Sequence, residues 1–292
     1  MEPLARAQPG VERWTGAAGG LGREGDGQVD RTLMGDMREL LEGVAAGDVS
    51  PAEAEAQLAG YATGDAGRFD AARTTRSGVP EAVLADGKTP AEVAALASTA
   101  VETTGRAIVT RADEAVLEAL EDVLAADHPG TTVEAADRSG VVVATTPGFE
   151  RPDLDASVGV VTAGTSDAVP AGEAAAIARE MGATVERVDD VGVASLARVV
   201  DSLEVLRDQD VLVVAAGREG ALPTVLAGLV DVPIIGLPVS TGYGHAGEGE
   251  AALSGMIQSC TALSVVNVDA GFTAGAQAGL IARRIDAARV DE

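Results

Sequence analysis

An alternation of aliphatic runs and helical segments fills the second half of this 292-residue chain. The run Val211–Ala215 is continuous and rich in β-branched residues, as expected of a parallel strand that is buried on both faces. Gly217 and Gly220 follow this run, and Pro223 then suits the first turn of a helix, where no N–H donor is needed. Arg218 and Glu219 are therefore predicted to lie on the turn between the strand and the helix.

The same unit repeats along residues 156–288, which are predicted to form one domain. The expected strands are 158–162, 184–188, 211–215, 233–237 and 264–268, and the expected helices are 170–181, 194–207, 223–230, 249–259 and 273–286. Such an alternation gives an α/β fold with a doubly wound parallel sheet, here of flavodoxin-like strand order. Ligands bind such sheets at the carboxyl ends of the strands.

The turn after the first of these strands carries small and polar residues. Gly164, Thr165, Ser166 and Asp167 could hold a ribose and a phosphate at a helix N-terminus, and the same residues would also serve as a helix cap. The turn lacks the G-x-G-x-x-G pattern of dinucleotide-binding folds.

Two later turns of this domain add further candidates. Tyr243 follows the fourth strand and could stack on a ring, whereas His245 beside it is interpreted as a loop residue. Asp269 follows the fifth strand and is either a ligand for Mg²⁺ that bridges phosphates or an ordinary cap.

The N-terminal half is predicted to be a second domain at residues 31–150, preceded by a disordered extension at 1–30. It begins with a helical hairpin and continues as a small α/β unit, and residues 147–155 link it to the next domain. The expected helices are 32–46, 50–61, 90–103 and 113–125, and the expected strands are 82–84, 106–110, 131–135 and 140–145.

The segment 69–81 has neither helical nor strand periodicity. Arg73 and Arg76 could bind phosphate or carboxylate oxygens through their forked donors, or they could keep a solvated connector soluble. Because the background is so acidic, two arginines beside Gly78 favour the anion-binding interpretation.

The charge of the chain excludes several classes of partner. The formal net charge is −25, with 46 acidic residues against 21 basic ones, of which Lys88 is the only lysine. Such a chain repels nucleic acid and anionic membranes, and its composition is typical of a cytoplasm rich in salt. Cys260 is the only cysteine, so no internal disulfide can form. Without an apolar run of spanning length or a signal peptide, we expect a soluble, cytoplasmic protein.

These motifs resemble two related families. Gly164-Thr-Ser-Asp167 and Ala216-Gly-x-x-x-x-Leu-Pro223 are similar to the PurE class of aminoimidazole-ribonucleotide carboxylases, but Ala221 stands where those enzymes have a catalytic histidine. The variant motifs look like LarB, the pyridinium-3,5-biscarboxylic acid mononucleotide synthase of nickel-pincer cofactor biosynthesis. They are Gly217-Arg-Glu-Gly-Ala-Leu-Pro223, Ser240-Thr-Gly-Tyr-Gly244, Ser259-Cys260, Val265-Val-Asn-Val-Asp-Ala-Gly-Phe272, Asp70-x-x-Arg73-x-x-Arg76-x-Gly78-x-Pro80-Glu81 and Asp86-Gly-Lys-Thr-Pro90.

The resemblance to LarB implies a reaction and a set of roles. CO2 would carboxylate the pyridinium ring of nicotinic acid adenine dinucleotide, and cleavage of the phosphoanhydride would release AMP. Cys260 would be the nucleophile and Glu219 the base, while Gly217, Arg218 and Gly220 would bind substrate. No tightly bound organic cofactor is expected, and PurE-like domains favour a homo-oligomer well above dimer size, such as an octamer.

Three alternatives stay open at this point. Without the resemblance, Cys260 would be read as a buried, inert residue, and its place near the end of a predicted helix disfavours a thiolate. The chain could also be a PurE-type carboxylase or mutase of purine biosynthesis, or a nucleotide-sensing protein without turnover. Ala221 argues against the purine enzyme, and Cys260 together with Glu219 argues against the sensor.

Overall fold

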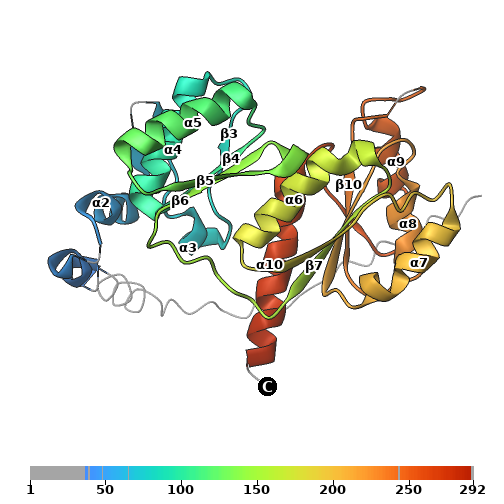
Figure 1. Cartoon of the computed structure of the whole chain (residues 1–292). Coiled ribbons are helices and arrows are strands. Elements are labelled where there is room, and N and C mark those ends of the chain that lie inside the picture. Colours follow the sequence, from blue (N-terminus) through green and yellow to red (C-terminus); the bar gives the residue numbers. More distant parts are fainter. Residues whose placement is uncertain (1–36, 39, 48, 65, 243, 291–292) are drawn as a thin grey trace, which may run out of the picture. The chain divides into compact units, whose positions relative to one another are not determined.

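The computed structural model describes residues 37–290 apart from 39, 48, 65 and 243 (Figure 1). The chain divides into two compact units, Met1–Asp48 and Val49–Glu292. The predicted extension at the N-terminus lies outside the described residues, as does Tyr243.

The described part of the first unit is helical at residues 37–38 and 40–46, inside the helix expected at 32–46. The second unit contains both α/β regions that the sequence predicts, so the expected linker at 147–155 joins two sheets of one compact unit.

The second unit begins with elements that precede the smaller sheet. A nine-residue helix leads into a short antiparallel hairpin and then into a helix of five residues. These elements are α2 (Pro51–Ala59), β1 (Ala62–Gly64), β2 (Gly67–Phe69) and α3 (Arg73–Ser77).

The smaller sheet has four strands in the order β3-β4-β6-β5. Strand β3 is parallel to β4, whereas β6 is antiparallel to both of its neighbours. Helix α4 begins with a complete capping box between Thr89 and Glu92, and Asp113 caps α5. The elements are β3 (Val83–Leu84), α4 (Pro90–Thr104), β4 (Arg106–Thr110), α5 (Glu114–Asp127), β5 (Thr132–Ala136), η1 (Asp137–Ser139) and β6 (Val141–Thr145).

The larger sheet confirms the predicted doubly wound architecture. Its five strands are all parallel and lie in the order β11-β10-β9-β7-β8, which is the flavodoxin-like order. The elements are β7 (Ser157–Thr162), η2 (Thr165–Asp167), α6 (Ala168–Glu180), β8 (Thr184–Val188), α7 (Leu196–Arg207), β9 (Val211–Ala216), α8 (Ala221–Ala227), β10 (Ile234–Pro238), α9 (Glu250–Ile257), β11 (Ser264–Val265) and α10 (Gly271–Val290).

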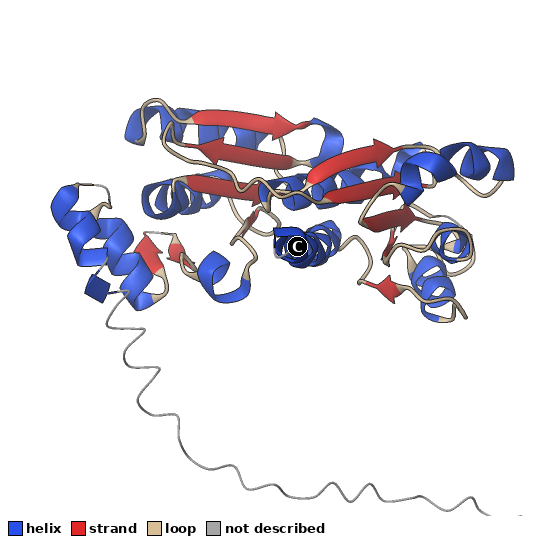
Figure 2. Ribbon diagram, turned by 90° about the horizontal axis from the view of Figure 1, so that it is seen from below, coloured by secondary structure: helices blue, strands red, loops and turns tan. Residues whose placement is uncertain are grey.

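Successive side chains of the central strand β9 enter two different cores. Val211 and Val213 pack with α6 and α10 on one face, whereas Leu212 and Val214 pack with α7, α8 and α9 on the other. Figure 2 shows the helices on both sides of the strands. Since both faces are covered, the strand needs aliphatic residues at every position, and this is why the sequence shows a continuous run.

Helices α6 and α10 approach each other closely because α10 presents glycine at every fourth residue. A Cβ atom on Gly275 would lie 2.3 Å from the carbonyl oxygen of Ala174, and one on Gly271 would lie 2.3 Å from that of Pro170. The Ala- and Gly-rich face of the last helix therefore packs on α6 of the same chain.

Two sets of contacts join the smaller sheet to the larger one. A shared core contains Ile108 and Val143 of the first and Ile177 of the second. Nearby, Arg106 Nη1 donates to a carboxylate oxygen of Glu180 at 2.9 Å, and both side chains are almost fully buried. Arg151 binds the other carboxylate oxygen, so this buried acid is doubly paired.

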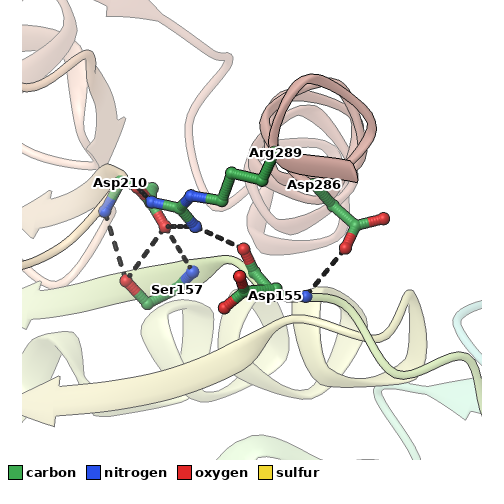
Figure 3. Close-up of polar contacts among 5 residues, drawn as sticks. All are labelled: Asp155, Ser157, Asp210, Asp286 and Arg289. Atoms are coloured by element: carbon green, nitrogen blue, oxygen red, sulfur yellow. Dashed lines mark hydrogen bonds and ion pairs between the residues drawn. The ribbon is translucent and has the colours of Figure 1, made fainter. Parts of the chain in front are cut away.

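The C-terminal end of α10 is tied to the amino ends of β7 and β9 (Figure 3). Arg289 donates to both carboxylate oxygens of Asp210 and to the carbonyl of Asp155, and Asp210 accepts the backbone N–H of Ser157. Burial alone would raise the pKa of Asp210, but the hydrogen bonds from Arg289 and Ser157 outweigh it and hold this pKa below its usual value.

The structure corrects some of the expected element boundaries. Segment 69–81 was expected to be irregular, but it contains α3, which is too short to show periodicity and ends at Gly78 in the left-handed conformation. The helix expected at 50–61 ends at Ala59 because the β1-β2 hairpin follows. Helix α8 begins at Ala221 rather than Pro223, and β11 ends at Val265.

The boundaries of the other elements agree with the ranges expected from the sequence to within a few residues.

Among the described residues, no helix combines the length and the apolar character needed to cross a lipid bilayer.

Candidate active site

The buried carboxylate of Asp167 holds together the turns that follow β7 and β9. Its Oδ2 accepts the backbone N–H of Gly164 at 2.8 Å, and its other hydrogen bonds come from the backbone of Gly217 and Ala163 and from the Ser166 hydroxyl. Burial raises the pKa of Asp167, while these hydrogen bonds act in the opposite direction. The two turns meet at the place where the strand order reverses, which is the usual ligand site of such a sheet.

Thr165 and Ser166 are exposed beside this carboxylate, on η2. The Ser166 carbonyl accepts a hydrogen bond from Thr241 Oγ1, so the turn after β10 is attached to the turn after β7. The structure thus brings together the four residues that the sequence assigns to ribose and phosphate, at the carboxyl edge of the larger sheet.

Arg218 and Glu219 line a cavity of about 180 Å³ together with residues of the loop after β10. Arg218 has a φ of 51°, and Gly220 next to the cavity has a φ of 64°. A Cβ on Gly220 would lie 2.5 Å from the carbonyl oxygen of Ala252, so no larger residue fits this turn. Left-handed conformations in residues other than glycine concentrate at functional sites, and two more, at Ala246 and Glu248, lie on the facing loop.

His245 lines the same cavity as Arg218 and Glu219. Its sequence context gives it no special status, since it stands in a Gly-rich loop without a recognisable partner. Only the tertiary structure places His245 and Glu219 on the wall of one cavity. The signal that could have identified it is proximity to the Ser240–Gly244 motif.

Cys260 is exposed, which excludes the interpretation as a buried packing residue. Helix α9 ends at Ile257, so the thiol lies in the connection that enters β11 rather than on the helix. Because β11 is parallel to β10 and β10 is parallel to β9, this connection is at the amino edge of the sheet, whereas Glu219 follows β9 at the carboxyl edge. Within one chain, the two predicted catalytic residues are therefore on opposite edges.

Asp269 connects the end of β11 to the smaller sheet. Its Oδ1 accepts the backbone N–H of Ser240 at 2.9 Å, and its carbonyl accepts a hydrogen bond from Arg111. Arg111 also pairs with Asp86, which belongs to the Asp86–Pro90 motif. The carboxyl ends of β3 and β4 thus meet the carboxyl edge of the larger sheet, and Arg111 is a linking residue that the sequence did not single out.

The Asp269 carboxylate is engaged by the protein itself. In the described part of the chain, no group of three or more His, Cys, Asp or Glu side chains is arranged to hold a metal. The Asp269 carboxylate caps a backbone amide, and the neighbouring charge is the cation of Arg111. The role of Asp269 as an Mg²⁺ ligand stays a prediction.

Both arginines of segment 69–81 are paired within that segment. Arg73 Nη1 contacts Glu81 Oε2 at 2.5 Å, and Arg76 contacts Asp70 at the same distance. The hydrogen bond to Asp70 raises the pKa of Arg76. Neither arginine lines the cavity at Glu219, so an anionic ligand would have to compete with the carboxylates of the segment itself.

Glu173 of α6 is buried near Arg111, the residue that links the two sheets. The backbone N–H of Phe272, at the start of α10, and the Thr110 hydroxyl donate to its carboxyl group. Burial raises the pKa of Glu173, and the charge of Arg111 acts against that effect. A buried carboxyl thus lies where the two sheets meet the N-terminus of α10.

Comparison with known proteins matches both halves of the second unit. The family model described as AIR carboxylase matches residues 157–292, and the one described as LarB/PurE-like N-terminal domain matches residues 61–137. An uncharacterized protein of Methanocaldococcus jannaschii, MJ0165, is 34% identical over 255 residues, which cover 85% of this chain and 97% of that protein. The first matched region runs from the β1-β2 hairpin through β5 of the smaller sheet, and the second contains the whole larger sheet.

Proposed function

The chain belongs to the LarB family and is a carboxylase-type enzyme related to the AIR carboxylases, and from this premise we propose its reaction. It carboxylates the pyridinium ring of nicotinic acid adenine dinucleotide and cleaves the phosphoanhydride, and the products are pyridinium-3,5-biscarboxylic acid mononucleotide and AMP. The observation that carries this proposal is the cavity that joins Glu219 and Arg218 at the carboxyl edge, without a histidine at position 221.

The carboxylation needs a nucleophile and a base. A thiolate adds to the ring carbon para to nitrogen and makes a dihydropyridine, whose free meta carbon is an enamine-like nucleophile. That carbon attacks CO2 and forms the new C–C bond. A base then removes the proton from the same carbon, the C–S bond breaks, and the electron pair returns to the thiolate as the pyridinium is restored.

Glu219 is suited to the role of the base. Its carboxylate is exposed at the cavity, and Arg218 beside it supplies a cation for the newly formed carboxylate. Ala221, where the purine enzymes have a histidine, supports a reaction in which proton transfer depends on another residue. The phosphoanhydride is cleaved by water, and AMP leaves with the oxygen that bridged the two phosphates or with one from water.

Cys260 supplies the thiolate, and its position requires that this thiolate come from another copy of the chain. Since Cys260 is at the amino edge and Glu219 at the carboxyl edge of one chain, the two act on one ring when copies of the chain share a site. We therefore propose a homo-oligomer, such as an octamer, in which the thiol of one copy serves the cavity of another.

One incubation separates this reaction from the alternatives. The protein is mixed with nicotinic acid adenine dinucleotide, bicarbonate and Mg²⁺, and AMP and the carboxylated mononucleotide are measured by mass spectrometry. Both products are expected. Turnover of aminoimidazole ribonucleotide with CO2 instead would identify a purine carboxylase, and binding of the dinucleotide without products would identify a sensor.

The shared site is tested by complementation. Cys260→Ser and Glu219→Gln are each expected to be inactive, but co-expression of the two variants creates mixed oligomers in which some sites combine an intact thiol with an intact carboxylate. Partial recovery of carboxylation supports the shared site. An equally inactive mixture, formed under conditions where mass measurement shows mixed oligomers, contradicts it.

A further inference from the structure

A second cavity lies beside the site at Asp167, on the side of β7 where β8 lies. It has a volume of about 500 Å³ and is lined by Thr162, Thr165 and Asp189 from the larger sheet and its turns, and by Arg187 of β8. The smaller sheet closes it through η1. This cavity is larger than the one at Glu219, and it falls in the range of roughly 300–1,000 Å³ that small-molecule sites occupy.

The tip of the β5-β6 hairpin also lines the cavity. Arg138 and Ser139 of η1 line it, and Ser139 packs so closely on α6 that a Cβ on Gly172 would lie 2.7 Å from the Ser139 Cβ. Ser139 Oγ is fixed by the carbonyl of Ala136 and by the backbone N–H of Val141. The hairpin tip, and with it Arg138, is therefore held at the rim by packing and by hydrogen bonds.

Two arginines give this cavity a positive character in a chain of net charge −25. Arg138 is exposed at the rim. Arg187 donates from Nη2 to Asp189 at 3.0 Å, while its Nε is buried and has no hydrogen-bond partner among the described residues. A buried donor with unused capacity is costly and marks sites that accept a further group. Asp189 is the one acid among the described residues that line the cavity, and it already binds Arg187 and the Thr162 hydroxyl.

We propose that this cavity binds the phosphate of the adenylate half of the substrate, with Arg187 and Arg138 as its cationic ligands. The inference rests on the proposed function, since it assigns the leaving nucleotide to a defined place. Thr165 lines the cavity, and Asp167 is two residues further along the same 3₁₀ turn, in the crevice between β7 and β9. The cavity and the turn that carries Asp167 are therefore adjacent.

The proposal also gives the N-terminal half a part in substrate recognition. Arg138 comes from the smaller sheet and Arg187 from the larger one, so the adenylate is held by both. Guanidinium groups suit a phosphate because their paired donors match its oxygens. The volume argues for a nucleotide rather than for inorganic phosphate alone, since a bare ion would fill a small part of the space.

Binding of AMP to the intact protein tests the proposal directly. Isothermal titration calorimetry with AMP, and separately with inorganic phosphate, is carried out on the wild type and on Arg187→Gln, Arg138→Ala and Arg284→Ala. Arg284 is an exposed arginine of α10 that lines none of the cavities described above, so it serves as the matched control.

The two cavity variants are expected to weaken AMP binding about tenfold or more, as the loss of a charge-assisted hydrogen bond does, whereas the control binds like the wild type. Arg138→Ala changes an exposed side chain and so keeps the result interpretable if Arg187→Gln is poorly folded. Wild-type affinity for AMP in both variants, or no AMP binding by the wild type, overturns the proposal. Phosphate binding as tight as AMP binding also overturns it, because the site would then recognise only an ion.

A parallel kinetic measurement distinguishes failure of this inference from failure of the proposed function. If the enzyme forms AMP and carboxylated product but Arg187→Gln and Arg138→Ala leave KM for the dinucleotide unchanged, the reaction stands and the adenylate site is wrong. If AMP binding depends on both arginines but no carboxylated product forms, the site stands and the proposed reaction is wrong.

Discussion

Replacement of Gly275 by alanine tests the close contact between α10 and α6. On helix propensity alone, alanine would stabilise the folded protein by about 1 kcal/mol, because glycine is the poorer helix former. The structure predicts the opposite sign. A Cβ at this position would lie 2.3 Å from the carbonyl oxygen, 2.9 Å from the Cα and 3.0 Å from the carbonyl carbon of Ala174, all of them backbone atoms.

The magnitude follows from these two opposing effects. Overpacking of a dense core costs roughly 1–3 kcal/mol, and backbone neighbours that cannot rotate away place Gly275→Ala at the upper end. After the gain in helix propensity is subtracted, about 2 kcal/mol of destabilisation remains. For a domain of this size, that lowers Tm by about 4–8 °C.

Gly279→Ala is the matched control on the same helix. Its nearest neighbours are the sulfur and methyl of Met181, at 2.6 and 2.8 Å, and this flexible side chain can move. Its Tm should therefore fall less than that of Gly275→Ala, or rise. Thermal unfolding followed by circular dichroism measures both variants. A Tm of Gly275→Ala equal to or above that of the wild type would refute the helix contact, and with it the assignment of this glycine face to α6.

Three further predictions concern the reaction and the stability of the fold. In the presence of substrate, Glu219→Gln should accumulate a covalent adduct on Cys260 that mass spectrometry detects, whereas Cys260→Ser should show none; carboxylation at the wild-type rate in Cys260→Ser would leave the thiol without a catalytic role. Arg73→Ala should weaken binding of the dinucleotide by roughly 1–3 kcal/mol while the circular dichroism spectrum stays unchanged, and wild-type affinity would make segment 69–81 a connector. Because the folded-state pKa of Asp210 is depressed, its stabilising contribution is present above its unfolded pKa near 3.9 and is lost as pH falls through the folded pKa. Denaturant titrations should therefore show Arg289→Ala less stable than the wild type at pH 7, with the difference shrinking as pH falls through the folded pKa of Asp210, and a difference that stays constant on acidification would contradict the argument.

The sequence by itself determined the architecture of the larger sheet. The run Val211–Ala215 has no polar residue because helices cover both faces of its strand, and this local property can be read without any tertiary contact. The turns after β7 and β9 were also predictable, since Gly164 and Gly217 mark the places where the backbone leaves the sheet. The carboxyl ends of parallel strands share one edge, so Asp167 and Glu219 could be assigned to that edge in advance.

Short elements without periodicity were not predictable. Helix α3 has five residues and none of them is buried, so it has no apolar face whose periodicity the sequence could show. Ion pairs with Glu81 and Asp70 engage both arginines of this segment, and the sequence pattern does not reveal these pairs.

Only the tertiary structure decided which residues meet across the two sheets and across the two edges. Arg138 and Arg187 are almost 50 positions apart in the sequence and line one cavity because η1 packs on α6. Gly271 and Gly275 serve α6 instead of another subunit, since a helix surface rich in small residues does not specify its partner. Cys260 was assigned to the site of Glu219, but the direction in which the chain enters β11 places it on the opposite edge, and strand direction is a property of the assembled sheet that no local pattern encodes.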